Sequence, residues 1–65
     1  MQVLDIEHFG GAFRVWLANY DVEVYCDIDR SGKVKGGTFK ADSASGLKAA
    51  ELAREAIREE YGASF

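Results

Sequence analysis

The sequence contains no proline, one cysteine and one histidine. A single cysteine excludes a disulfide framework inside the chain. One Cys and one His cannot complete the tetrahedral shell of a structural zinc ion without two carboxylates, and no pair of ligands has the required spacing. We therefore expect no disulfide, no metal ion and no cofactor.

Long apolar runs are also missing. No stretch of about 18 apolar residues occurs, so we expect no segment that crosses a membrane. The first residues show no basic leader followed by an apolar stretch, so we expect no secretory signal. An unpaired cysteine fits a reducing compartment, and these features together predict a cytoplasmic protein.

The length of 65 residues predicts a single compact domain, residues 1–65, and the apolar content of 48% is ordinary for a globular chain. A domain this short buries only roughly 60% of the surface that its unfolded chain exposes. Its stability is therefore marginal. A homodimer is an open alternative, because association would enlarge the buried core.

The formal net charge is −3, and the two signs are segregated along the sequence. Residues 1–29 contain Arg14 as their only basic residue and the acids Asp5, Glu7, Asp21, Glu23, Asp27 and Asp29. The following segment is a basic strip that contains Arg30, Lys33, Lys35 and Lys40. An acidic chain binds nucleic acid poorly, because phosphate neutralisation supplies most of that affinity. Its acidic part can instead face a basic partner.

Alternation of apolar and polar residues predicts strands over residues 2–9, 12–18 and 22–28, with a looser one over 34–39. In the first of these, Leu4, Ile6 and His8 alternate with Val3, Asp5 and Glu7. The connecting segments are rich in Gly, Asn and Asp, which tolerate positive φ in tight turns. They are Gly10-Gly11, Asn19-Tyr20-Asp21 and Asp29-Arg30-Ser31-Gly32-Lys33.

A C-terminal helix follows, with Asp42, Ser43 and Ser45 as candidate N-caps and Gly46 in its first turn. Gly62 is expected to end it, and the Phe65 tail folds back. At about 100° per residue, one half of the helix carries the apolar residues, with Lys48, Glu51, Arg54, Glu55, Arg58 and Glu59 opposite. The apolar half comprises Leu47, Ala49, Ala50, Leu52, Ala53, Ala56, Ile57 and Tyr61.

Short connections make the strands antiparallel neighbours. The predicted fold is therefore α+β: an antiparallel meander of three to four strands with one C-terminal helix packed on one face. The strand residues expected to face this helix are Phe13, Val15, Leu17, Val22, Val24, Cys26 and Ile28.

The opposite sheet face is expected to carry Arg14, Trp16 and Ala18 on one strand and Glu23, Tyr25 and Asp27 on the next. The fourth strand adds either Lys35 and Phe39 or Val34 and Thr38, depending on the register around Gly36-Gly37. Two interpretations of the Trp–Tyr pair stay open. It is either a cross-strand pair that contributes roughly 0.2–1 kcal/mol to the sheet, or the core of a recognition surface with a polar rim.

Catalysis and metal binding are disfavoured. The segment from Asp27 to Gly32 matches the opening of a calcium loop, but the twelfth position is Thr38 where that loop has Glu, and Lys33 and Lys35 would crowd the ion. Cys26 lies on the apolar side of its strand, where a thiol is inert. His8 has no nucleophile at a diagnostic spacing, so we expect no catalytic residue and a protein that is not an enzyme.

The preferred hypothesis is a small interaction protein that binds a protein or nucleoprotein with a basic surface. The residues expected to bind this partner are Arg14, Trp16, Asp21, Glu23, Tyr25 and Asp27. Compact acidic proteins of this kind include phage and mobile-element inhibitors that occupy basic grooves of host nucleic-acid-processing complexes, which makes an anti-defence role a candidate.

The alternative is a nucleic-acid-binding module that uses the sheet face and the strip formed by Arg30, Lys33, Lys35 and Lys40. A small sheet followed by a helix is similar in topology to the arm-site DNA-binding domains of phage-type integrases, which place the sheet face on DNA. That resemblance would assign DNA contacts to Arg14, Trp16, Tyr25 and Lys35. Glu23 and Asp27 on the same face depart from it, because their charge repels phosphate.

Overall fold

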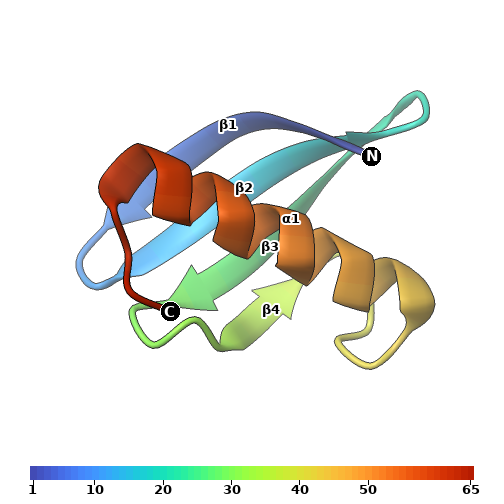
Figure 1. Ribbon diagram of the computed structural model, residues 1–65. Coiled ribbons are helices and arrows are strands. Elements are labelled where there is room, and N and C mark those ends of the chain that lie inside the picture. Colours follow the sequence, from blue (N-terminus) through green and yellow to red (C-terminus); the bar gives the residue numbers. More distant parts are fainter.

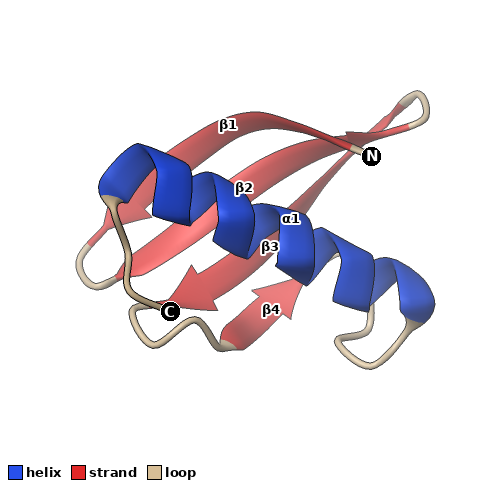
Figure 2. Cartoon of the chain, in the orientation of Figure 1, coloured by secondary structure: helices blue, strands red, loops and turns tan.

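The computed structural model describes the whole chain, residues 1–65, as one antiparallel sheet with a helix across one face (Figure 1, Figure 2). The strands are β1 (Gln2–Phe9), β2 (Ala12–Asn19), β3 (Val22–Asp29) and β4 (Val34–Gly37), and the helix is α1 (Ala44–Tyr61). The strands pair in the order β1-β2-β3-β4. The predicted α+β meander is therefore confirmed, and the first strand belongs to the same sheet as the others.

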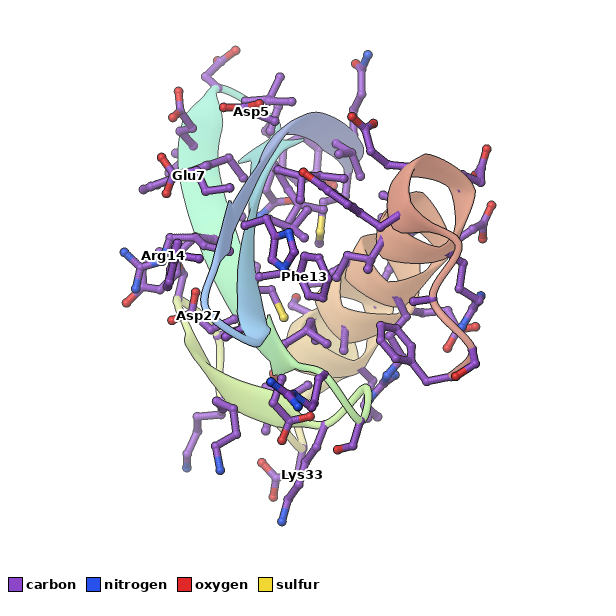
Figure 3. The ribbon with its side chains drawn as sticks, turned by 90° about the vertical axis from the view of Figure 1, so that its left-hand side faces the viewer. Asp5, Glu7, Phe13, Arg14, Asp27 and Lys33 are labelled. Atoms are coloured by element: carbon purple, nitrogen blue, oxygen red, sulfur yellow. The ribbon has the colours of Figure 1, made fainter.

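The core lies between the sheet and α1, where Figure 3 shows Phe13. Val15, Leu17 and Ile28 from the sheet and Ile57 from α1 are fully buried. The other buried hydrophobic residues are Phe13, Val24, Cys26, Ala49, Ala50 and Ala53. Alternation in β2 and β3 supplies the sheet half of this core, and the short alanine side chains let α1 lie close to it.

Val22 departs from the predicted core. It is 61% exposed, although alternation puts it on the same side as Val24. It pairs with Asn19 at the tip of the β2–β3 hairpin, and Figure 1 shows this tip lying away from α1. The left-handed residue of the turn is Tyr20, with φ 58°, instead of Asn19 or Asp21. Alternation assigns a side chain to a face of the sheet but does not say how far the helix covers that face.

A β-bulge at Leu4 breaks the strict alternation expected in β1. Val3 and Asp5 pair with consecutive residues of β2, which leaves Leu4 without a partner in the register. Val3 therefore joins Ile6 and His8 on the helix side, and Leu4 is 50% exposed. The predicted grouping of Val3 with Asp5 and Glu7 is wrong, because one extra residue transfers the preceding side chains to the other face.

β4 ends at Gly37, earlier than the predicted end at Phe39, and it bulges at Lys35. Gly37 adopts φ 155°, and a Cβ atom there would lie 2.8 Å from the Tyr25 carbonyl oxygen. Beyond it, the Thr38 N–H donates to the Tyr25 carbonyl (3.0 Å), and the Thr38 hydroxyl accepts from the Tyr25 N–H (3.1 Å). A side chain thus replaces one main-chain partner of β3, and the strand stops.

The two ends of α1 follow the predicted capping chemistry. Ser43 is the N-cap, and its hydroxyl accepts from the Gly46 N–H (3.0 Å) and donates to the Lys40 carbonyl (2.7 Å). Gly46 is buried, and a Cβ atom there would collide with the same carbonyl. At the other end, Gly62 has φ 68° and donates to the Arg58 carbonyl (2.9 Å).

The C-terminal tail returns to the β3–β4 turn, as Figure 1 shows. The Phe65 side chain packs over Gly32, which adopts φ 88° and is buried. Arg54 donates from Nε to the Gly32 carbonyl (2.6 Å), and Arg58 donates from Nη1 to the Phe65 main-chain oxygen (2.8 Å). The expected fold-back of Phe65 is confirmed, and it extends the core beyond the end of α1.

Truncation of Ile57 tests the docking of α1 on the sheet. Ile57→Ala removes a fully buried side chain and should lower the free energy of unfolding by about 2–5 kcal/mol. Leu47→Ala is the matched control on the same helix, because Leu47 is 60% exposed despite its predicted place on the apolar half. Urea denaturation should separate the two variants, and equal stabilities would contradict the packing described.

Candidate functional site

The sheet face turned away from α1, here called the outer face, carries the candidate site. The register places the side chains of three strands in cross-strand rows on it. One row is Asp5, Trp16 and Tyr25, and a second is Glu7, Arg14 and Asp27. Figure 3 shows Asp5, Glu7, Arg14 and Asp27 on this side of the sheet, with Phe13 on the other. Ala18 and Glu23 form a further pair.

Four of these side chains, Arg14, Trp16, Tyr25 and Asp27, form one connected group that we call the quartet. Arg14 donates from Nε and Nη2 to the two carboxylate oxygens of Asp27, at 2.7 and 2.9 Å. Its guanidinium carbon lies 4.4 Å from the ring centroid of Tyr25. The Trp16 and Tyr25 rings are 5.5 Å apart and inclined by 50°. Each member is half-buried by the others and by the sheet.

The ion pair orders the quartet. The hydrogen bonds to Asp27 raise the pKa of the Arg14 guanidinium above its ordinary value, which shows how strongly the charged guanidinium is held. A bidentate pair of this geometry also restricts both side chains to one arrangement. The quartet is therefore a fixed aromatic and guanidinium surface whose two formal charges balance.

The acids around the quartet have no such partner. The ion pairs in the chain are Arg14–Asp27 and a long contact of 4.0 Å between Arg54 and Glu51. Asp5, Glu7 and Glu23 take part in neither, and all three are exposed. The outer face consequently combines a neutral aromatic centre with an acidic border.

The structure brings together most of the residues predicted for the site. Arg14, Trp16, Glu23, Tyr25 and Asp27 share the outer face, whereas Asp21 lies in the β2–β3 turn at the end of it. Sequence reasoning missed Asp5 and Glu7. Their alternation was visible, but the position of β1 in the sheet and its bulge could not be inferred from it.

Neither predicted contribution of β4 to the outer face is correct. Val34 pairs with Ile28 and packs against the core together with Phe39, and Lys35 is the bulged residue. The position opposite Asp27 belongs to Gly36. The outer face therefore has no side chain on β4 beside Asp27, because the bulge shifts the register by one residue.

The basic strip is exposed but lies apart from the quartet. Lys35 is on β4, Arg30 and Lys33 belong to the β3–β4 turn, and Lys40 is in the connection to α1. Arg30 lies against the main chain of Gly11 in the β1–β2 turn. Figure 3 shows Lys33 at the opposite end of the sheet from Asp5. The three lysines thus lie on β4 and its flanking connections, whereas Arg30 reaches the β1–β2 turn.

The two residues considered for nucleophilic chemistry serve packing. Cys26 is buried in the core, and burial raises the pKa of its thiol, which disfavours the reactive thiolate. His8 lies on β1, with its ring stacked on Phe13 at 4.4 Å and edge-on to Tyr61 at 5.0 Å. No helix of the structure combines the length and the apolar character that crossing a membrane requires.

The carboxylates of the calcium-like segment already have internal partners. Asp27 binds Arg14, and one oxygen of Asp29 accepts from the Ser31 N–H (2.9 Å), the Ser31 hydroxyl (2.6 Å) and the Lys33 N–H (3.0 Å). These bonds hold the turn in which Gly32 has positive φ. The segment therefore has the geometry of a hairpin turn, and weak calcium affinity stays a prediction.

The same hydrogen bonds make the turn sensitive to pH. The Ser31 hydroxyl and the Lys33 N–H lower the pKa of Asp29, so folding favours its charged form. Its contribution to stability should be present above the ordinary value of about 3.9 and be lost as the pH falls through the folded-state pKa. A carbon NMR titration should show Asp29 of the native protein titrating below that value and Ser31→Ala moving it upward. A titration unchanged by Ser31→Ala would contradict the assignment.

Comparison with known proteins finds no family model that matches the chain. It also finds no similar curated protein and no similar solved structure.

Proposed function

We propose that this chain is a small non-enzymatic interaction protein that binds a basic protein surface through its outer face. The observation that supports this most strongly is the combination of the quartet with the unpaired acids Asp5, Glu7 and Glu23 around it. Aromatic centres with a polar border are typical of binding surfaces.

The quartet suits the role of an anchor. Arg14 pairs with Asp27 and covers Tyr25, so the aromatic side chains are held in place before a partner arrives. Ordered side chains lose little further entropy on binding. Trp, Tyr and Arg at the centre of an interface can each account for about 2 kcal/mol or more of affinity when water is excluded.

The charges favour a protein over a nucleic acid. The cation nearest the aromatic rings is Arg14, and its charge is balanced by Asp27. Phosphates approaching this face would meet the acids of β1 and β3, which opposes the neutralisation that nucleic-acid binding requires. The acids would instead accelerate association with a basic protein and make it sensitive to salt.

The class of partner we propose is a nucleic-acid-processing complex of a host cell, blocked by a phage or mobile-element protein. Such complexes hold their substrate in basic grooves, and an acidic face with aromatic anchors can occupy a groove of that kind. Small size and the lack of catalytic groups support this class, and an anti-defence role would follow from it.

Substitution of Trp16 tests the proposed function. The wild-type protein and Trp16→Ala, immobilised in parallel, should differ in capture of one basic protein from a host lysate at 150 mM salt. With the purified partner, Trp16→Ala should weaken the affinity about 30-fold, since about 2 kcal/mol is lost. Asp21→Lys with Glu23→Lys should mainly slow association. Asp27 is left unchanged in this variant because its replacement would release Arg14.

Two controls make the outcome decisive. Leu47→Ala alters an exposed apolar residue on the opposite side of the molecule and should leave capture unchanged. DNA and RNA should bind weakly near 150 mM salt, where the screening length is roughly 8 Å. Sub-micromolar binding to either one, lost in a Lys33→Ala, Lys35→Ala variant, would reject the proposal in favour of a nucleic-acid-binding module.

A further inference from the structure

The two edges of the sheet differ in how they are protected. β4 is four residues long, contains two glycines and bulges at Lys35, and these are devices that discourage pairing with another strand. β1 is eight residues long and pairs only with β2; it bulges at Leu4, but its residues 5–9 keep a regular register and contain neither lysine nor proline. Its outer edge therefore leaves alternate N–H and C=O groups without a strand partner.

A shallow groove of about 290 Å³ runs beside β1 on the helix side. Val3, Leu4 and Ile6 of the strand and Ala56 of α1 supply apolar atoms to it. Asp5, Glu59 and Glu60 also line it, and no basic residue contributes to its lining. A strand added beside β1 would thus contact apolar residues on its helix-side face. Acidic residues would lie next to both of its faces.

The charges on β1 discriminate between occupants. Asp5 and Glu7 point to the outer face and lack ion-pair partners. If two copies of the chain paired through β1, these acids would be brought together across the new interface, and like charges in adjacent strands are destabilising. A basic strand would instead neutralise them. The acids thus act against self-association while leaving the edge open to a positive segment.

We infer that β1 takes up an extended basic segment of the partner as an additional antiparallel or parallel strand. Side chains of a strand alternate between its faces. Apolar residues of the segment would therefore enter the groove at Val3, Ile6 and Ala56, and its lysines or arginines would lie beside Asp5 and Glu7. This inference rests on the proposed function, because it specifies the part of the basic partner that reaches the edge of the outer face.

A synthetic peptide can test the edge without knowledge of the partner. The probe is a nine-residue peptide of alternating Lys and Val, acetylated and amidated, titrated into isotope-labelled protein and followed by amide NMR. Main-chain amides of β1 should shift and exchange more slowly with solvent. An N-methylated version of the peptide, which lacks half of its donors, should bind at least tenfold more weakly. A peptide of the same composition, with its lysines in one block and its valines in another, should also bind at least tenfold more weakly.

Protein variants locate the interaction. Asp5→Lys with Glu7→Lys should weaken peptide binding at least tenfold. Glu51→Lys with Glu55→Lys, which changes the net charge equally on the exposed side of α1, should alter it less than threefold. Trp16→Ala should leave peptide binding unchanged while it weakens binding of the partner about 30-fold, which separates this inference from the proposed function.

Four results would overturn the inference. Shifts confined to other elements would place the peptide elsewhere, and equal affinity of the block peptide would reduce the effect to net charge. Protection of β1 that rises with protein concentration, without peptide, would identify a second copy as the occupant. If β1 remains unperturbed while Trp16→Ala still weakens partner binding, the edge inference fails and the proposed function stands.

Discussion

A single helix can cover only one face of a four-stranded sheet, and the other features of this protein follow from that limit. The covered face can be built from Val, Leu, Ile and Phe because α1 closes it against water. The uncovered face must be stable in water, so its strands are held together by pairs that satisfy polar groups. The bidentate bond between Arg14 and Asp27, beside the Trp16–Tyr25 contact, serves this purpose. The two interpretations of the aromatic pair are therefore compatible, because the contacts that order the sheet also hold a potential anchor in place.

Charge follows the same division. Once Arg14 is paired with Asp27, the acids Asp5, Glu7 and Glu23 have no ion-pair partner on the outer face. The lysines that would balance them are on the β4 side of the molecule, where one of them forms the bulge of the edge strand. This separation of charges does not destabilise the fold, because exposed charges are well solvated. It does give the two edges and the two faces of the sheet different affinities for charged partners. We consider this asymmetry, rather than any single residue, to be the property that a partner would recognise.

Much of the architecture can be predicted from the sequence. Period-two alternation identifies β2 and β3, and the capping residues Ser43 and Gly62 define the helix. What the sequence does not specify is the effect of single extra residues. The bulges at Leu4 and Lys35 move neighbouring side chains to the other face, and both result from pairing between distant segments. Five of the predicted site residues are found together, because β2 and β3 pair without a bulge. Asp5 and Glu7 were missed, because they lie on β1, which has one. Val22 shows a further limit, because its exposure depends on how far α1 covers the sheet.

We propose that the outer face contacts a partner through Trp16. The chain contains one tryptophan, so incorporation of 5-fluorotryptophan gives a single fluorine NMR signal from the centre of that face. On saturation with the captured partner, we predict that this signal moves and loses its dependence on the H₂O-to-D₂O ratio, because the indole becomes shielded from solvent. A signal that keeps its position and its solvent dependence in the saturated complex would contradict a contact between Trp16 and the partner.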